Sequence, residues 1–431
     1  MNRGLKKIII LIVTIFFVTI GSFGVFYKAA IEEDPIKLIE KELGKKLDNL
    51  DIFMALSNSE KIEDFEYLCY AIENNFIYFN KVIQEKNIDW YELKKSYSKK
   101  ILDCKSNSDF KQLINDFFKY LDGGCGLTEF FYTKFLFETY GKEDTYFAWH
   151  KIIHNKTLIE KNLTWVKYRY LSSYKTYLKN IYSELRYIKY KKKDSNFYTD
   201  YNKDSSIAYI KFLSFSNFLL ERDKKKLYEF YKSIEDADKL IIDLSSTTIG
   251  TSEYWKNLIV RPLINSDLQY SYFCGVSNGI QSKDAYKEII KDEKLEKLDF
   301  PPINIELSEY LKDDSTFYRY TKKIKKDGSI NFKGKIYIVI RDNYGSATDE
   351  FAYFCKQTGF ASLVGEETSG GSMGLYPILL YLPNSGLVFY ITSSEGFHLD
   401  GSSSAYKGVK PDYYYKNIIA STIEYIKNIK D

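Results

Sequence analysis

An uninterrupted apolar segment near the C-terminal end of the chain is followed by a short polar turn and a helical pattern. Residues 336–340 contain only Ile, Tyr and Val, which is typical of a strand buried on both faces of a parallel sheet. Residues 346–355 then carry apolar side chains at helical spacing, with two acidic residues near the start, where the helix dipole favours them. Gly345 allows a tight bend before Ser346. The pattern therefore predicts a buried strand, a bend and a helix that begins near Ser346.

A serine at such a strand-to-helix bend can serve in two ways. Its hydroxyl can be exposed with the positive end of the helix dipole behind it, which is the position of a catalytic nucleophile. The alternative is an ordinary serine that caps the helix. The local pattern is compatible with both interpretations of Ser346.

Other segments of the C-terminal half predict more strands of the same sheet. One strand, amphipathic helix and strand follow one another at residues 205–215, 223–238 and 239–246. This order indicates a right-handed crossover unit, and residues 335–364 predict a second. Residues 375–394 predict two strands joined by a turn at 383–386. We therefore expect an α/β sheet domain over residues 204–431.

The region before this domain, residues 35–203, has mainly helical periodicity. Short amphipathic segments occur at 63–72, 90–97 and 110–121, and the glycine pair at 123–124 predicts the end of the last one. Residues 145–192 predict further helices rich in aromatic and basic side chains. Aromatic residues at helical spacing usually pack in a core, so we expect packing helices here, not a recognition surface.

The first residues predict a membrane segment. Residues 8–27 contain no charge, a length that spans a bilayer. Basic residues precede this segment and acidic residues follow it, so residues 1–7 are expected in the cytoplasm and the body outside it. A cleavable signal peptide is the alternative, although Lys28 disfavours a cleavage site ending at Ala30.

Composition and charge argue against several other classes of protein. The chain of 431 residues is 45% hydrophobic and 28% charged, which is typical of a globular protein. Its 62 basic and 58 acidic residues are spread along the chain, so no nucleic-acid partner is expected, and the short lysine run at 187–194 is interpreted as a solvated loop. The five cysteines show no paired spacing. His150 and His154 lack the glutamate of an HExxH site, so neither a metal nor a cofactor is expected.

Several motifs together carry a family resemblance. Residues 345–352 read GSATDEFA, residues 363–371 read LVGEETSGG, and the chain also contains KLIIDLSSTTIG at 239–250 and DGSSSAYKGVKPD at 400–412. These motifs resemble the tail-specific, or C-terminal processing, serine peptidases. Residues 63–80 and 88–101 are similar to the N-terminal cap of that family's branch with GExTxGG endings. The resemblance implies a crotonase-like α/β peptidase domain with a helical cap, acting on peptides or protein C-termini.

The resemblance also assigns roles to individual positions. Ser346 matches the family's nucleophile, and the backbone amides of Gly250 and Ala347 match its oxyanion donors. Ile249 stands where the oxyanion loop of the family has glycine. The loop that carries these donors is therefore altered beside Gly250.

The positions of the family's base and acid hold other residues. Gly371 occupies the place of the lysine base of one branch, and Cys125 the place of the histidine base of the other. Ala405 occupies the place of the acidic residue. A cysteine has a reference pKa near 8.5 and cannot easily replace a histidine, because a thiolate would itself compete as the nucleophile. His398, in GFHLDG, is the remaining candidate for a substitute base, and an ordinary turn histidine is the alternative.

Two hypotheses about function follow. The first is a membrane-anchored serine peptidase that cleaves extracytoplasmic peptides with Ser346. The second is a catalytically inactive relative that binds peptides or partner proteins without turnover. The PDZ module of the family is not evident in residues 131–200, which lack its short strands and its carboxylate-binding glycine loop.

Overall fold

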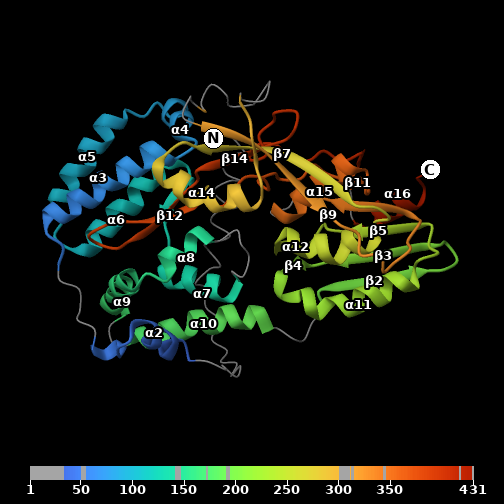
Figure 1. The fold of residues 1–431 in the computed structure, drawn as a ribbon, viewed down its shortest axis with the longest axis horizontal. Coiled ribbons are helices and arrows are strands. Elements are labelled where there is room, and N and C mark those ends of the chain that lie inside the picture. Colours follow the sequence, from blue (N-terminus) through green and yellow to red (C-terminus); the bar gives the residue numbers. More distant parts are fainter. Residues whose placement is uncertain are drawn as a thin grey trace.

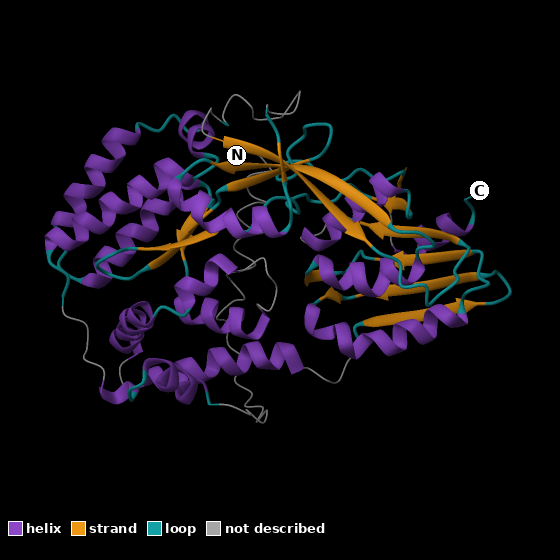
Figure 2. Cartoon of the chain, in the orientation of Figure 1, coloured by secondary structure: helices purple, strands orange, loops and turns teal. Residues whose placement is uncertain are grey.

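The computed structural model describes residues 34–49, 55–140, 147–170, 173–190, 195–299, 311, 315–342, 346–416 and 419–429. A mainly helical lobe and a strand-rich lobe lie side by side, and the long strands β7 (Leu268–Ser277) and β9 (Ser315–Ile324) run along the top of the view between them (Figure 1). Figure 2 shows the same division in its colours, with helices concentrated in the lobe that contains the N-terminal half.

The strand-rich lobe is built on a six-stranded sheet in the order β15-β11-β10-β5-β3-β2. These strands are β2 (Phe197–Asn202), β3 (Ile207–Phe212), β5 (Lys239–Asp243), β10 (Lys335–Ile340), β11 (Ser362–Gly365) and β15 (Tyr413–Tyr414). Strands β3, β5, β10 and β11 pair in parallel, so both predicted crossover units are confirmed. Strand β2 pairs antiparallel with β3. The sheet therefore begins before residue 204. The sequence did not predict β2, because most of its side chains are exposed and lack the pattern of a buried strand.

Helices cover both faces of this sheet. Ile336, Ile338 and Ile340 of β10 join the main core, which also contains side chains of α11 (Leu220–Ser233), α12 (Ser252–Trp255) and α15 (Ser346–Thr358). Tyr337 and Val339 pack on the other face with Ile426 of α16 (Ile419–Lys427). Strand β10 is therefore buried on both faces, as its uninterrupted apolar pattern predicts.

The remaining strands form smaller sheets. Strands β12 (Ile378–Tyr381) and β13 (Val388–Ile391) form the predicted hairpin, and β1 (Cys125–Leu127) of the N-terminal half pairs with β13. A four-stranded sheet has the order β14-β7-β9-β8, with β14 at Ser394–Phe397 and β8 at Glu296–Lys297. Strands β4 (Ser214–Phe215) and β6 (Thr248–Gly250) pair in parallel as a two-stranded sheet.

The N-terminal half folds into helices, as predicted. They are α2 (Pro35–Leu43), η1 (Leu47–Asn49), α3 (Asn58–Asn75), α4 (Phe79–Glu85), α5 (Trp90–Leu102), α6 (Asn107–Phe118), η2 (Lys119–Leu121), α7 (Phe130–Tyr140), α8 (Phe147–Ile153), α9 (Lys156–Tyr170) and α10 (Tyr174–Tyr190). Capping boxes at Ser57 and Ser106 begin α3 and α6. Beyond them lie η5 (Asn217–Leu219), the π-helix η6 (Lys256–Val260), α13 (Arg261–Leu263) and α14 (Ile280–Asp292).

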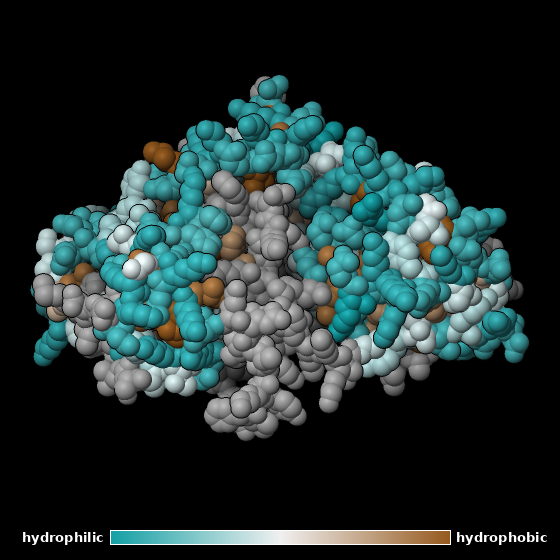
Figure 3. Space-filling model, turned by 60° about the horizontal axis from the view of Figure 1, so that its bottom comes forward, coloured by the Kyte–Doolittle hydropathy of each residue, from teal (hydrophilic) through white to brown (hydrophobic). Residues whose placement is uncertain are grey.

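Two cores hold the helical lobe against the rest of the chain. Side chains of α3, α5 and α6 belong to the same core as the six-stranded sheet. Helices α2, α7, α9 and α10 form a second core with β12 and β13. On the face drawn in Figure 3, the described surface is mostly hydrophilic and its hydrophobic residues form small separate patches. On this face, the apolar residues of the described part are thus largely inside.

The predicted membrane segment, residues 8–27, lies outside the described residues. Within the part of the chain that the structure describes, no helix is both long enough and apolar enough to cross a membrane. The same part contains no group of His, Cys, Asp or Glu side chains arranged for a metal ion. His154 instead contacts Glu42, with 2.8 Å between Nδ1 and Oε1.

Candidate active site

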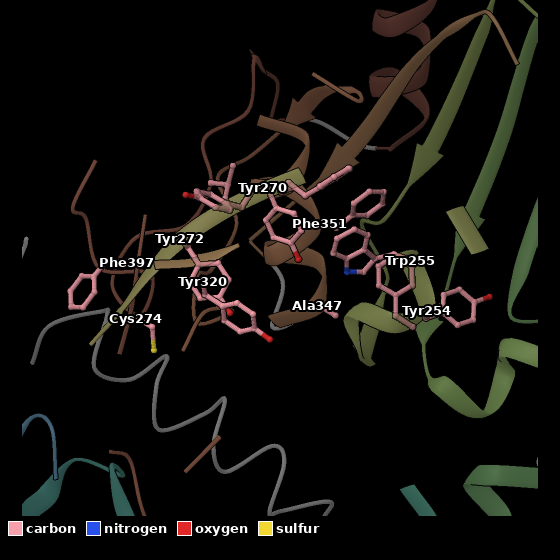
Figure 4. Close-up of a cluster of buried hydrophobic side chains, with 14 of the residues drawn as sticks. Tyr254, Trp255, Tyr270, Tyr272, Cys274, Tyr320, Ala347, Phe351 and Phe397 are labelled. Atoms are coloured by element: carbon pink, nitrogen blue, oxygen red, sulfur yellow. The ribbon is translucent and has the colours of Figure 1, made fainter. Parts of the chain in front are cut away.

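The position of Ser346 follows directly from the sheet topology. Strand β10 ends at Ile340 and α15 begins at Ser346, so the predicted strand and the predicted helix start are confirmed, while the predicted bend at Gly345 lies outside the described residues. Ala347 is buried in the first turn of α15 and lies beside Trp255 and Phe351 (Figure 4). The rings of Trp255 and Phe351 stack with their centroids 4.7 Å apart. Aromatic packing therefore sets the position of the helix start on which the candidate nucleophile lies.

Asp349 connects α15 to the loop that contains Gly371. Its carboxylate accepts hydrogen bonds from the hydroxyls of Thr368 and Ser372, and from the backbone amide of Gly370. Burial raises the pKa of Asp349 to about 6, although these hydrogen bonds act in the opposite direction. The amide of Gly371 donates to the carbonyl of Ser404 at 2.6 Å. The loop is thus held between α15 and the segment that leads to Ala405.

Glu350 connects α15 to the loop that contains Gly250. Its carboxylate accepts from Tyr270 Oη at 2.5 Å, from Lys322 Nζ at 2.9 Å and from the hydroxyl of Ser252. Burial opposes ionisation of Glu350, but the charges of Lys322 and Lys256 together with the hydrogen bonds lower its pKa to about 2. Glu350 is therefore a stable buried anion, paired with a cation and well supplied with donors.

Gly250 lies where no side chain fits. A Cβ atom built on Gly250 would stand 2.3 Å from Cβ of Phe215, in the neighbouring strand β4. The next amide, of Thr251, donates to the carbonyl of Phe215 at 2.9 Å. The candidate oxyanion strand is thus packed directly against the backbone of β4, and the role of Gly250 and Ala347 as oxyanion donors stays a prediction.

Cys125 does not have the environment of a proton-transfer group. It lies in β1 opposite Ile391, and its side chain is 2% exposed. Burial raises the pKa of its thiol well above the ordinary value, while a backbone hydrogen bond with Thr392 acts weakly in the other direction. The thiol is thus neutral at physiological pH and is a poor acceptor for a proton from serine.

Ala405 adjoins a buried carboxyl group that sequence reasoning missed. The amide of Ala405 donates to Glu395 Oε1 at 3.3 Å, and the hydroxyl of Ser403 lies 2.5 Å from the same oxygen. Tyr78, from the helical lobe, donates to Oε2 of Glu395. Burial raises the pKa of Glu395 to about 8. In the sequence, the only signal was a charged residue within the segment TSSEGF of an otherwise apolar region.

His398 packs against α15, but at a distance from its start. Its ring stacks on Tyr353 with centroids 4.7 Å apart, and its Nδ1 lies 3.0 Å from the hydroxyl of Ser402. Tyr353 comes two helical turns after Ser346, and seven residues at 1.5 Å each correspond to about 10 Å along the helix axis. A general base must come within hydrogen-bond reach of its proton. These contacts place His398 beside the second turn of α15 after Ser346, and its role as a base stays a prediction.

Two surface hollows lie at the amino ends of the parallel strands of the six-stranded sheet, whereas Ser346 follows a carboxyl end. One is lined by residues 235–239 and 333–335, and the other by residues 263–268, 332–336 and 358–362. These residues include the first residues of β5, β10 and β11, whereas Ser346 follows the last residue of β10. Ligands of parallel α/β sheets bind beyond the carboxyl ends of the strands, so the hollows are not the candidate site.

Comparisons with known proteins agree with this arrangement. The model of peptidase family S41 matches residues 206–415, and the model of the tricorn protease C1 domain matches residues 57–119. Together the two matches support a tail-specific S41 peptidase family for this chain. No curated protein matches the chain.

The solved structures to which this chain is similar are distant in sequence. A candidate peptidase from Parabacteroides merdae is 14% identical, with a TM-score of 0.50, over 86% of this chain and 98% of that chain. The photosystem II D1 C-terminal processing protease is 12% identical over 86% of this chain and 97% of that one, with a TM-score of 0.47. A lipoprotein from Streptococcus agalactiae is 16% identical over 88% of this chain and 99% of that chain, with a TM-score of 0.41. At these identities the likeness concerns the fold alone.

Proposed function

We propose that this protein is a membrane-anchored, extracytoplasmic member of the tail-specific peptidase family that binds peptides or protein C-termini at the start of α15, with hydrolysis lost or strongly reduced. One observation carries the proposal: the family's base and acid positions hold Gly371, Cys125 and Ala405. None of these side chains can accept a proton at neutral pH, since Cys125 is buried and its thiol pKa is raised.

The size of the loss follows from the role of a base. A serine hydroxyl attacks a peptide bond only when its proton is removed in the transition state, and a positioned base contributes about 100- to 10,000-fold. Residues of a catalytic unit act together, so loss of the base costs about as much as loss of the whole unit. A member without a base keeps the surface that binds peptide but turns over slowly.

An active serine peptidase with a different base is the second candidate. It is favoured by the preserved strand-to-helix position of Ser346 and by the hydrogen bonds that hold Asp349 to the Gly371 loop. Under this alternative, a group outside the family positions removes the proton of Ser346.

The full chain, purified in detergent, distinguishes the two candidates. A fluorophosphonate probe should label Ser346 weakly or not at all, and casein should remain intact, while a fluorescein-labelled peptide with a free C-terminus binds. Ser346→Ala is the matched control for labelling and should retain peptide binding. Strong labelling that Ser346→Ala abolishes would establish the peptidase, and a peptide that fails to bind would refute the binding function.

The membrane assignment is tested separately. If residues 8–27 are an uncleaved anchor, the protein should fractionate with membranes at full mass, and protease added from outside should digest the body. Recovery of a shortened soluble form that begins near Ala30 would show that the segment is a signal peptide.

A further inference from the structure

Two adjacent carboxylates follow Ser346 in α15, and each is bonded to a different loop. Asp349 and Glu350 are 1% and 4% exposed. Asp349 contacts residues 368–372, here called the Gly371 loop. Glu350 contacts Ser252, the first residue of α12, and the segment 247–252, which contains β6 and ends at Ser252, is here called the Gly250 loop. Adjacent side chains of one helix thus reach loops that are more than a hundred residues apart in sequence.

The helical geometry places Ser346 between these two contacts. Successive residues of an α-helix are rotated by about 100°, so positions i+3 and i+4 lie on either side of position i, one turn further along. Helical side chains also point back towards the N-terminus. The carboxylates of Asp349 and Glu350 therefore project towards the turn that contains Ser346, one on each flank.

The partners show that both contacts need an acceptor. The backbone amide of Gly370 can only donate, and it donates to Asp349. Lys322 of β9 also can only donate, and it donates to Oε1 of Glu350 at 2.9 Å, whereas Ser252 donates to Oε2. A neutral amide of the same shape keeps one oxygen acceptor, but it removes the charge and turns the second acceptor into a donor. Substitution by Asn or Gln would thus weaken the contact while it preserves the volume.

We propose that Asp349 and Glu350 are positioning residues that fix the Gly371 loop and the Gly250 loop on the two flanks of Ser346. The inference rests on the proposed function, because it concerns the same peptide-binding site. Asp349 determines where the backbone of Gly370 and Gly371 lies, and Glu350 determines where the Gly250 strand ends. The two loops form the walls of the site, and each is held independently of the other.

Hydrogen–deuterium exchange of the full chain in detergent tests the two contacts separately. Asp349→Asn should raise amide exchange in residues 368–374 about tenfold and leave residues 247–252 unchanged, since one lost charged hydrogen bond is worth about that factor. Glu350→Gln should do the reverse. Asp116→Asn, at an exposed carboxylate bonded to Lys119 and Gln112, is the matched control and should change neither loop.

The partner hydroxyls provide a second set of variants if a carboxylate variant fails to fold. Ser372→Ala and Ser252→Ala each remove one donor and leave both carboxylates in place. Each should raise exchange in its own loop by a few-fold. The positioning role is wrong if the folded variants exchange as the parent does, or if exchange rises equally throughout α15 and both loops.

Peptide binding gives the functional measurement. Each carboxylate variant, once shown to be folded under the assay conditions, should weaken binding of the fluorescein-labelled peptide about tenfold, whereas the surface control Asp116→Asn should leave binding unchanged. If the parent does not bind the peptide, the proposed function fails, but the exchange experiment still decides whether the two loops are held in this way. Unchanged binding together with raised loop exchange would show that the loops do not form the site.

Discussion

Two regions of this molecule bury carboxylates in different ways. At the start of α15, Glu350 is paired with Lys322, and its pKa is lowered to about 2. In β14, Glu395 contacts the hydroxyls of Tyr78 and Ser403 and the amide of Ala405, with no cation among these partners, and its pKa is raised to about 8. Burial penalises the charge in both places, so the paired cation decides the difference.

The comparison bears directly on the proposed function. The region around α15 keeps a charged framework that holds the nucleophile helix and its two loops. Near β14, the thiol of Cys125 and the carboxyl of Glu395 both have raised pKa values and are neutral at physiological pH. Under the proposed function, the first region would hold the nucleophile helix, and the second would lack a group ready to transfer protons.

The largest expected effect is the loss of the cation that pairs with Glu350. Lys322→Ala would leave a buried carboxylate without its counter-ion and should lower the free energy of unfolding by about 3 to 5 kcal/mol. Urea unfolding followed by tryptophan fluorescence at pH 7 measures this. The double variant Lys322→Met, Glu350→Gln should recover most of the loss. If Lys322→Ala lowers the free energy of unfolding no more than the double variant does, the ion pair is not what distinguishes the surroundings of Glu350 from those of Glu395.

The second effect concerns Glu395 and pH. Its pKa in the folded protein, about 8, lies above the ordinary value of 4.5, so the unfolded chain releases this proton first as the pH rises. The contribution of Glu395 to stability is therefore fully present below about pH 4.5 and is lost progressively up to about pH 8. The free energy of unfolding therefore falls by about 1.4 kcal/mol per pH unit in this range, or by roughly 3 kcal/mol between pH 5 and pH 7.

Glu395→Gln isolates this contribution. The variant should lose that slope, so its stability relative to the parent should rise between pH 5 and pH 7 in urea titrations at several pH values. Asp116→Asn serves as the control, because its carboxylate is near the surface. Parallel pH profiles for the parent and Glu395→Gln would mean that Glu395 is ionised in the folded protein and that the two regions do not differ.

The third effect is a rescue of proton transfer beside β14. Cys125→His with Ala405→Glu restores the family's base and acid types, and a Glu395→Gln background removes the neighbouring carboxyl group. Casein hydrolysis should rise about 100-fold above the parent if the histidine reaches Ser346. Adding Ile249→Gly should increase the rate further only when the histidine is present, because residues of one catalytic unit are non-additive. A folded variant that stays inert would show that Cys125 does not face the site.

The smallest effect is expected at His398. Because its ring stacks on Tyr353 two turns beyond Ser346, His398→Gln should change fluorophosphonate labelling by less than about twofold, and the lost aromatic pair should cost about 0.5 to 1.5 kcal/mol of stability. Tyr353→Leu removes the same stacking from the other side and is the matched comparison. A large loss of labelling in His398→Gln alone would restore the interpretation of His398 as a base.

Elements with a strong local pattern were predictable from the sequence. The apolar runs of β5 and β10 and the periodicity of α11 and α15 predicted the crossover units, and the turn at 383–386 predicted the β12–β13 hairpin. Strands β1 and β2 were missed because each is short or largely exposed, and their pairing depends on a partner strand. The candidate nucleophile was identified, but the surroundings of Cys125, His398 and Ala405 were not.

The sequence by itself determined the class of fold, the family and the residue types at the base and acid positions, because these depend on local periodicity and on motifs that can be compared position by position. Only the tertiary structure decided that Glu395 stays neutral while Glu350 is charged. Their partners are remote in the chain: Tyr78 lies 317 positions from Glu395, and Ser252 lies 98 positions from Glu350. The state of a buried carboxylate depends on which donors and cations the fold brings to it, and no local pattern contains that information.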